Sequence, residues 1–169
     1  MKFVMTVLSF GLAATAQAGE TFTYPVLNEY QAQAEKVLAL SKVERAQLNI
    51  AELKLETQTL IGLGEEIARL YIAKNPVCAE QINTFLSALP KMTEMPLSDV
   101  NEKFHAGKGL PQAPRHCYFG RSEIVHPVMN QIRLKGELTD EMLSQIEDDF
   151  DEVIEHLSRI QKNLDNPLN

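Results

Sequence analysis

The chain has 169 residues, of which 44% are hydrophobic and 23% are charged, and its formal net charge at pH 7 is −7. This length fits one domain, and the acidic charge argues against nucleic acid as a partner, because phosphate binding requires a concentrated basic face. The charge is unevenly spread: residues 101–136 carry 6 basic and 2 acidic side chains (+4), whereas residues 137–169 carry 2 basic and 10 acidic ones (−8).

The first 18 residues have the pattern of a secretory signal peptide. Lys2 precedes an apolar run over residues 3–14, and residues 16–18 (Ala-Gln-Ala) have the A-x-A form of a cleavage site. We therefore expect residues 1–18 to be removed and residues 19–169 to form a single helical domain that is periplasmic or secreted. The apolar run is too short to span a bilayer and no later run is longer, so no membrane span is expected.

The segments that follow are rich in Ala, Leu, Glu, Gln and Lys, which are good helix formers. We expect a first helix over residues 28–40 and then a long helix that ends at Lys74. Ser41 and Glu44 have the spacing of a capping box, so the chain either breaks and restarts near Ser41 or continues as one helix. Residues 62–64 (Gly-Leu-Gly) lie inside the helical pattern, where small residues permit close helix packing or a kink.

The middle of the chain predicts shorter helices. Asn75-Pro76 supplies a cap and a first-turn proline for a third helix over residues 76–89. Residues 90–96 then form a connector to a short helix that is capped by Ser98. That helix is expected to end at Gly107, because glycine readily adopts the left-handed conformation that ends many helices.

Residues 107–120 hold three glycines and two prolines with little periodicity, so we expect an irregular loop there. The next helix is expected to begin at Ser122 or at His126-Pro127 and to stop at Gly136.

The last helix has the clearest amphipathic pattern in the chain. Thr139 is expected to cap it, Leu138 and Leu143 have the spacing of a hydrophobic staple, and the helix should run to Asp165. Its predicted core stripe consists of Leu143, Ile146, Phe150, Val153, Ile154, Leu157, Ile160 and Leu164.

Together these segments predict an all-α fold, an antiparallel four-helix bundle with one or two short extra helices and a long irregular loop. The two cysteines, Cys78 and Cys117, are an even count in a chain with an export signal, so we expect a disulfide that pins the loop. The alternative is a pair of free thiols that bind metal or carry out redox chemistry, but the sequence lacks a C-x-x-C pair.

Polar chemistry concentrates in the basic loop, residues 105–127, beside a predicted helix start whose free N–H groups attract anions. A small carboxylate, a phosphate or an acidic surface of a partner protein can dock at such a loop. The residues expected to bind it are His105, Arg115, His116, Arg121 and His126. In the structural alternative, the loop pairs with the acidic final segment, and His126 before Pro127 is an N-cap whose ring bonds the backbone.

Asp149, Glu152 and His156 follow one another at steps of three and four, along one edge of the last helix. Such a ridge can bind a divalent metal if a neighbouring helix adds a ligand, for which His126 is a candidate, but it more commonly forms a solvated polar face. Haem is the other candidate cofactor. The sequence has no C-x-x-C-H motif, and His156 falls at the edge of the apolar stripe of its helix, not at its centre.

Enzyme signatures are missing from the sequence. It contains no G-x-S-x-G, no H-E-x-x-H and no phosphate-binding glycine loop, and a disulfide would remove Cys117 beside His116 as a nucleophile. We therefore expect an exported, non-enzymatic helical protein without a cofactor that binds a partner protein or a small anionic ligand through the basic loop. The alternative function is a metal- or haem-binding four-helix bundle protein.

Overall fold

A computed structural model describes residues 21–167, and these residues form six α-helices with short 3-10 and π turns and no strand. The helices are α1 (Pro25–Ser41), α2 (Ile50–Lys74), α3 (Ala79–Met92), α4 (Leu97–Val100), α5 (Phe119–Arg133) and α6 (Asp140–Asp165). The predicted all-α class is therefore confirmed. The predicted signal peptide, residues 1–18, lies outside the described residues.

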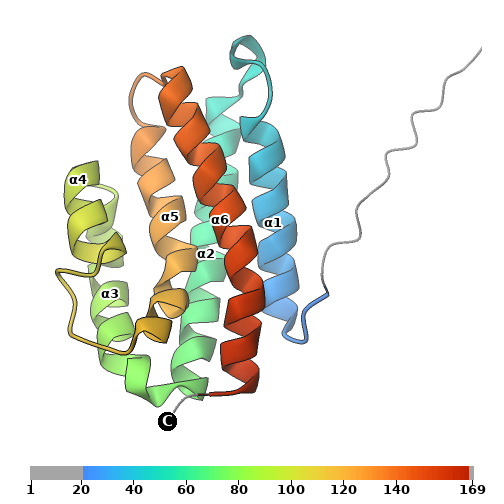
Figure 1. Ribbon diagram of the computed structural model, residues 1–169. Helices are drawn as coiled ribbons and strands as arrows, with labels where there is room; N and C mark the ends of the chain where they lie inside the picture. The colour runs from blue at the N-terminus through green and yellow to red at the C-terminus, as the bar shows by residue number, and fades with distance from the viewer. Residues whose placement is uncertain (1–20, 168–169) are drawn as a thin grey trace, which may run out of the picture.

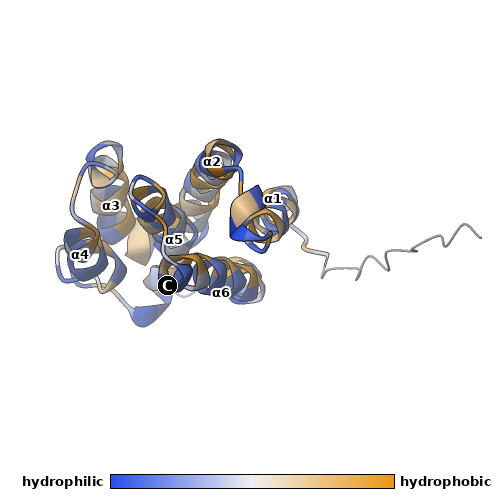
Figure 2. Cartoon of the chain, turned by 90° about the horizontal axis from the view of Figure 1, so that it is seen from above, coloured by the Kyte–Doolittle hydropathy of each residue, from blue (hydrophilic) through white to orange (hydrophobic). Residues whose placement is uncertain are grey.

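The long helices α1, α2, α5 and α6 lie side by side (Figure 1), and each packs against at least two of the others. Helix α1 contacts α2 and α6, and α5 contacts the same two helices from the opposite side. Figure 2 looks down these helices and shows α3 and α4 on the outer side of α5, away from α1. The buried apolar side chains form one cluster, whose largest members include Tyr30, Tyr71, Phe85 and Phe150.

None of the helices within residues 21–167 is both long enough and apolar enough to cross a membrane.

The junction between α1 and α2 is a break, as one of the two alternatives predicted. The Ser41 hydroxyl donates a hydrogen bond of 2.8 Å to the Leu38 carbonyl, so Ser41 closes α1 and does not cap the next helix. Asn49 caps α2 instead, since its side chain accepts a hydrogen bond from the Glu52 amide at 3.2 Å. The capping box predicted at Ser41 and Glu44 is therefore wrong, because the buried Ser41 hydroxyl hydrogen-bonds to a carbonyl of the preceding turn instead.

Helix α3 extends three residues beyond its predicted end at Leu89 and includes Pro90 in its last turn. Leu89 and Met92 are both buried, so their packing holds the last turn in place although the proline offers no N–H. The predicted stop before Pro90 is therefore wrong.

The disulfide between Cys78 and Cys117 is present, with the two Cα atoms 5.2 Å apart. It joins the 3-10 turn before α3 to the 3-10 turn before α5, and both cysteines are fully buried. The short helix α4 continues as a π turn over Asn101–His105, and Gly107 follows with φ of 77°. The predicted pairing of the cysteines and the predicted stop at Gly107 are confirmed.

Helix α5 begins at Phe119, earlier than predicted, and Pro127 lies inside it. A proline in a helix leaves the carbonyl four residues before it without its usual N–H partner, here the carbonyl of Glu123. The Tyr30 hydroxyl from α1 donates a hydrogen bond of 2.9 Å to that carbonyl. The prediction that α5 begins at Ser122 or at Pro127 is wrong, because a contact from another helix replaces the bond that the proline removes.

We expect Tyr30→Phe to lower the free energy of unfolding by about 1–2 kcal/mol, because the buried Glu123 carbonyl loses the donor that compensates for Pro127. Urea unfolding followed by circular dichroism measures the change. Tyr24→Phe is the matched control. Tyr24 is partly exposed, so removal of its hydroxyl should change the free energy of unfolding little. Equal effects of the two substitutions would contradict this role of Tyr30.

Candidate functional site

An open pocket of about 720 Å³ lies beside the start of α5. Its walls come from the end of the π turn, the following irregular loop, the 3-10 turn Arg115–Tyr118 and the first turn of α5. Four of the five predicted ligand-binding residues line this basic pocket, and no acidic residue of the described part of the chain does. The four are His105, Arg115, His116 and Arg121.

Arg121 is the most buried cation of the basic pocket, with 4% of its surface exposed. Its Nη1 donates to the carbonyls of Phe104 and His105, and the guanidinium lies 5.0 Å from the centre of the Tyr118 ring. Gly107 leaves the space for it, because a Cβ there would lie 3.0 Å from Nη2. Burial lowers the pKa of Arg121 to about 10, so the side chain is still charged at neutral pH.

The charge of Arg121 has no counter-ion among residues 21–167. Its hydrogen-bond acceptors are the carbonyls of Phe104 and His105, and its Nε has no hydrogen-bond partner in the part of the chain that the structure describes. A buried charge costs free energy unless an opposite charge or enough hydrogen bonds compensate it. The position therefore favours a negatively charged group in the pocket.

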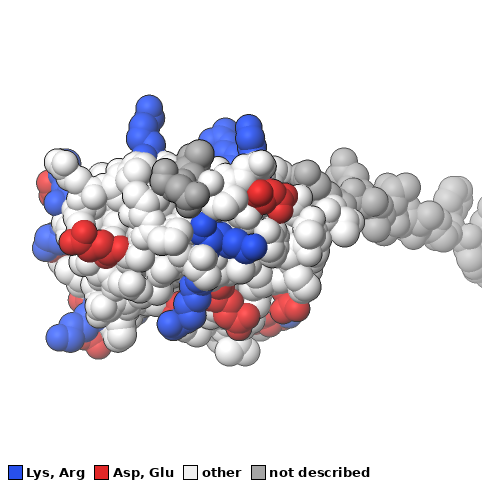
Figure 3. All heavy atoms as spheres, turned by 90° about the horizontal axis from the view of Figure 1, so that it is seen from below, with Lys and Arg blue, Asp and Glu red and all other residues white. Residues whose placement is uncertain are grey.

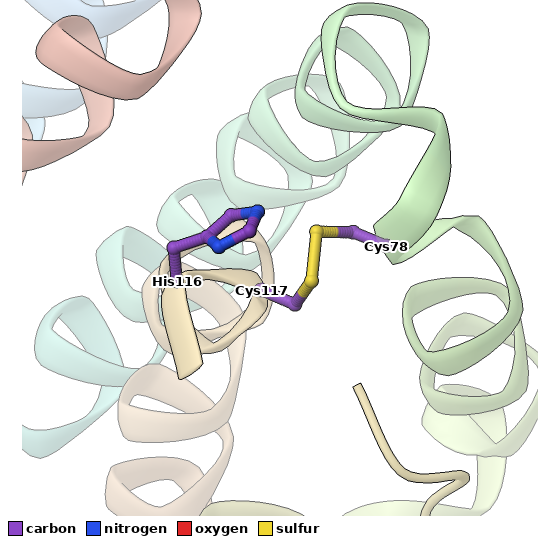
Figure 4. A group of neighbouring side chains, drawn as sticks. All are labelled: Cys78, His116 and Cys117. Carbon is purple, nitrogen blue, oxygen red and sulfur yellow. A yellow bond between two sulfur atoms is a disulfide. The ribbon is translucent and has the colours of Figure 1, made fainter. Parts of the chain in front are cut away.

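Arg115 and His116 extend the polar wall. Arg115 is exposed, and no ion pair involves it among the described residues. The His116 ring lies beside the disulfide (Figure 4), and its Nε2 is buried without a partner among the same residues. The His116 carbonyl accepts a hydrogen bond of 2.8 Å from Tyr71, which fixes this turn against α2.

A nitrogen of His116 and the two cysteine sulfur atoms lie within 4.8 Å of one another. Because the sulfur atoms are bonded to each other, neither is a thiolate, and thiolate is the form of cysteine that binds metals. This group is therefore part of the disulfide's packing and not a metal site in the oxidised protein.

The acidic helix α6 pairs with cations from outside the basic pocket. Asp149 contacts Arg133, and more exposed carboxylates of α6 lie near Lys42 and Arg45. The structural alternative, in which the basic loop pairs with this segment, holds for His126, which contacts Asp149 and Glu152. Arg115 and Arg121 form no such ion pair among the described residues. Figure 3 shows cationic and acidic side chains interspersed at one end of the molecule, so the basic character of the pocket is local.

Behind the basic pocket, a hydrogen-bonded chain leads into the protein. The Tyr118 hydroxyl lies 3.1 Å from His105 Nε2 and 3.0 Å from His126 Nε2, and His126 Nδ1 lies 3.1 Å from an oxygen of Asp149. Because the Asp149 carboxylate accepts, Nδ1 of His126 carries a proton, and Nε2 accepts from Tyr118. His105 then donates to the tyrosine oxygen. Burial lowers the pKa of His105, and the neighbouring His126 lowers it further.

His126 is thus not the N-cap considered in the structural alternative, since its ring contacts side chains and lies in the middle of α5. It does not line the basic pocket either. Its exposed fraction is 1%, and its neighbours on α6 are Asp149 and Glu152. Arg133 holds the second oxygen of Asp149 at 2.5 Å, so this carboxylate is anchored from two sides.

His156 lies at the other side of Glu152, with Nε2 at 3.4 Å from its Oε1. Although the sequence places His156 at the edge of an apolar stripe, only 6% of it is exposed, because the rings of Tyr118 and Phe119 pack on it. Its Nδ1 lies 3.7 Å from the buried carboxyl of Glu123. Burial raises the pKa of Glu123, and the contact with His156 opposes that rise.

Sequence reasoning missed two members of this site, Tyr118 and Arg133. Glu123 precedes His126 by three residues, a spacing seen in carboxylate metal sites, but this match is attributed to chance. Arg133 had a signal, because it follows His126 by seven residues, which is two helical turns and therefore the same face. Tyr118 precedes α5 in a 3-10 turn, so no helical spacing pointed to it. The contact of Glu123 with His156 depends on the early start of α5.

Comparisons with models of protein families, with curated proteins and with solved structures find no match to this chain. A function for this chain must therefore be inferred from the residues of the site.

Proposed function

We propose that this chain is an exported helical protein that binds a small anion, a carboxylate or a phosphate, in the basic pocket. The observation that carries the proposal is Arg121, a buried guanidinium without a carboxylate partner among the described residues on the wall of an acid-free pocket. Arg115 adds a second cation at the rim. Guanidinium groups bind carboxylate and phosphate oxygens through paired N–H donors, which suits both classes of anion.

A small ligand is favoured over a partner protein because the basic groups line a concavity. A volume of about 720 Å³ lies within the range of small-molecule sites, about 300–1,000 Å³. A flat or convex basic surface would favour a protein partner instead.

The proposed architecture around the pocket is an antiparallel four-helix bundle of α1, α2, α5 and α6, supported by the contact of each helix with two others. Export is supported by the disulfide, which is typical of oxidising compartments, and by the signal pattern of residues 1–18. We propose binding and not turnover, because Cys117 beside His116 is held in the disulfide.

Isothermal titration of the mature protein with inorganic phosphate and with succinate, after a chelating resin has removed metal ions, tests the proposal. We expect saturable binding of at least one of the two anions, weakened about tenfold or more by Arg115→Ala, because a charged hydrogen bond contributes about 1.5–3 kcal/mol. Arg115 is exposed, so its removal leaves the fold intact.

Arg69→Ala is the matched control. It removes the same charge from an exposed position on α2 whose partner is Glu65, outside the pocket. Binding that is absent for both anions, or that falls equally in the two variants, would overturn the proposal.

A further inference from the structure

Two buried histidines on neighbouring helices point the same nitrogen at one carboxylate. Glu152 Oε1 lies 3.7 Å from His126 Nε2 and 3.4 Å from His156 Nε2. We propose that His126, His156 and Glu152 bind one divalent first-row transition-metal ion, with Zn²⁺ as the reference ion, between α5 and α6. The site is separate from the anion-binding pocket, and the inference does not depend on that pocket being used.

The two distances from Glu152 suit a small ion, whereas the two histidine rings must move closer together to share it. Ligand atoms about 2.0–2.1 Å from a tetrahedral Zn²⁺ lie about 3.3 Å from one another, close to both distances from Glu152. The ring centres of His126 and His156 are 6.2 Å apart. Two imidazoles on one such ion have ring centres about 5 Å apart, so the ion draws the rings together by about 1 Å.

The opposite nitrogens of both histidines face carboxylates, which is the arrangement that orients metal-binding histidines. Asp149 accepts from Nδ1 of His126, and the buried Glu123 lies 3.7 Å from Nδ1 of His156. A carboxylate at Nδ1 directs the lone pair to Nε2, the atom that faces Glu152. Nδ1 of His156 and Oε2 of Glu123 lack hydrogen-bond partners among residues 21–167.

The ligand set differs from the acidic ridge that the sequence suggested. Atoms of His126, Asp149 and Glu152 do lie within 4.8 Å of one another, but both oxygens of Asp149 are already engaged, by His126 and Arg133. Asp149 therefore positions His126, and the third ligand is His156.

The site is accessible from one side. The side chain of Glu152 is 46% exposed, whereas His126 and His156 are buried, so an ion enters past the carboxylate. At His126 the ion takes the lone pair that the Tyr118 hydroxyl now uses. Tyr118 is thereby released or becomes a further contact. Two imidazoles and one carboxylate favour Zn²⁺, Ni²⁺, Cu²⁺ or Fe²⁺ over Mg²⁺ and Ca²⁺, which prefer oxygen ligands.

Titration of the mature protein with ZnCl₂, after treatment with chelator and without a polyhistidine tag, tests the site. We expect one ion per chain and weaker binding in Glu152→Gln, by about 100-fold, because even the loss of an orienting partner costs about 10–100-fold in metal affinity. Glu152 is exposed, so this variant keeps its fold. Asp149→Asn should weaken binding about 10–100-fold through misorientation of His126.

Glu155→Gln is the matched control, since Glu155 is an exposed carboxylate of the same helix with no histidine contact among the described residues. The Co²⁺-loaded protein should in addition show the visible absorption of a four-coordinate site, and Glu152→Gln should lose it. Absence of Zn²⁺ and Co²⁺ binding, or equal loss in Glu152→Gln and Glu155→Gln, would overturn the inference. Anion binding measured on the metal-free protein stays independent of either result.

Discussion

Replacement of both cysteines by alanine should lower the free energy of unfolding by about 4 kcal/mol, the largest single effect expected in this protein. The disulfide closes a loop with a sequence separation of 39 residues, and in the chain-entropy model such a loop contributes about 4 kcal/mol. The change is expected to be global, because Cys78 and Cys117 are both fully buried in the core. Urea unfolding of the double variant against the parent protein measures it.

Reductant provides the control for the disulfide. It should destabilise the parent protein by a similar amount and leave the double alanine variant unchanged. After the disulfide is lost, the turn that bears His116 is still held by the hydrogen bond from Tyr71. Equal denaturation midpoints for the parent and the variant would mean that this hydrogen bond and the surrounding packing suffice.

The elements that the sequence predicts well are those that depend on near neighbours in the chain. Thr139 caps α6 as expected, because its side chain needs only the Met142 amide, 3.1 Å away in the same turn. The stop at Gly107 likewise follows from the backbone freedom of one residue. The cysteine pairing is predicted from an even count and from the signal-peptide pattern of the first 18 residues.

The start of α5 shows what such reasoning misses. Pro127 is a strong local signal for a helix start, yet the helix continues through it because Tyr30, 93 residues from Glu123 in the chain, satisfies the freed carbonyl. The candidate metal site likewise depends on contacts between residues that are far apart in the chain. Spacing on α6 indicated Glu152 and His156, but which nitrogen of His126 faces them depends on how α5 packs on α6.

The second large effect concerns a glycine at the contact of α2 with α5. We expect Gly64→Ala to lower the free energy of unfolding by about 3 kcal/mol, the upper end of the range for overpacking. The added Cβ would lie 2.5 Å from the Glu123 carbonyl oxygen and 2.8 Å from Ile124 Cγ1. Because the nearest atom belongs to the backbone, no change of side-chain conformation relieves the clash and the two helices must separate.

Gly62 supplies the opposite case two residues earlier on the same helix. A Cβ at Gly62 meets no atom within 4 Å, so Gly62→Ala should raise the stability by about 0.5–1 kcal/mol, the usual gain when a helical glycine becomes alanine. Chemical denaturation of both variants shows whether each substitution raises or lowers the free energy of unfolding. Stabilisation by Gly64→Ala as well would contradict the close approach of α2 to Glu123. Destabilisation by Gly64→Ala alone means that the absence of a Cβ at Gly64 is needed to bring α2 up to the turn of α5 that holds Glu123 near His156.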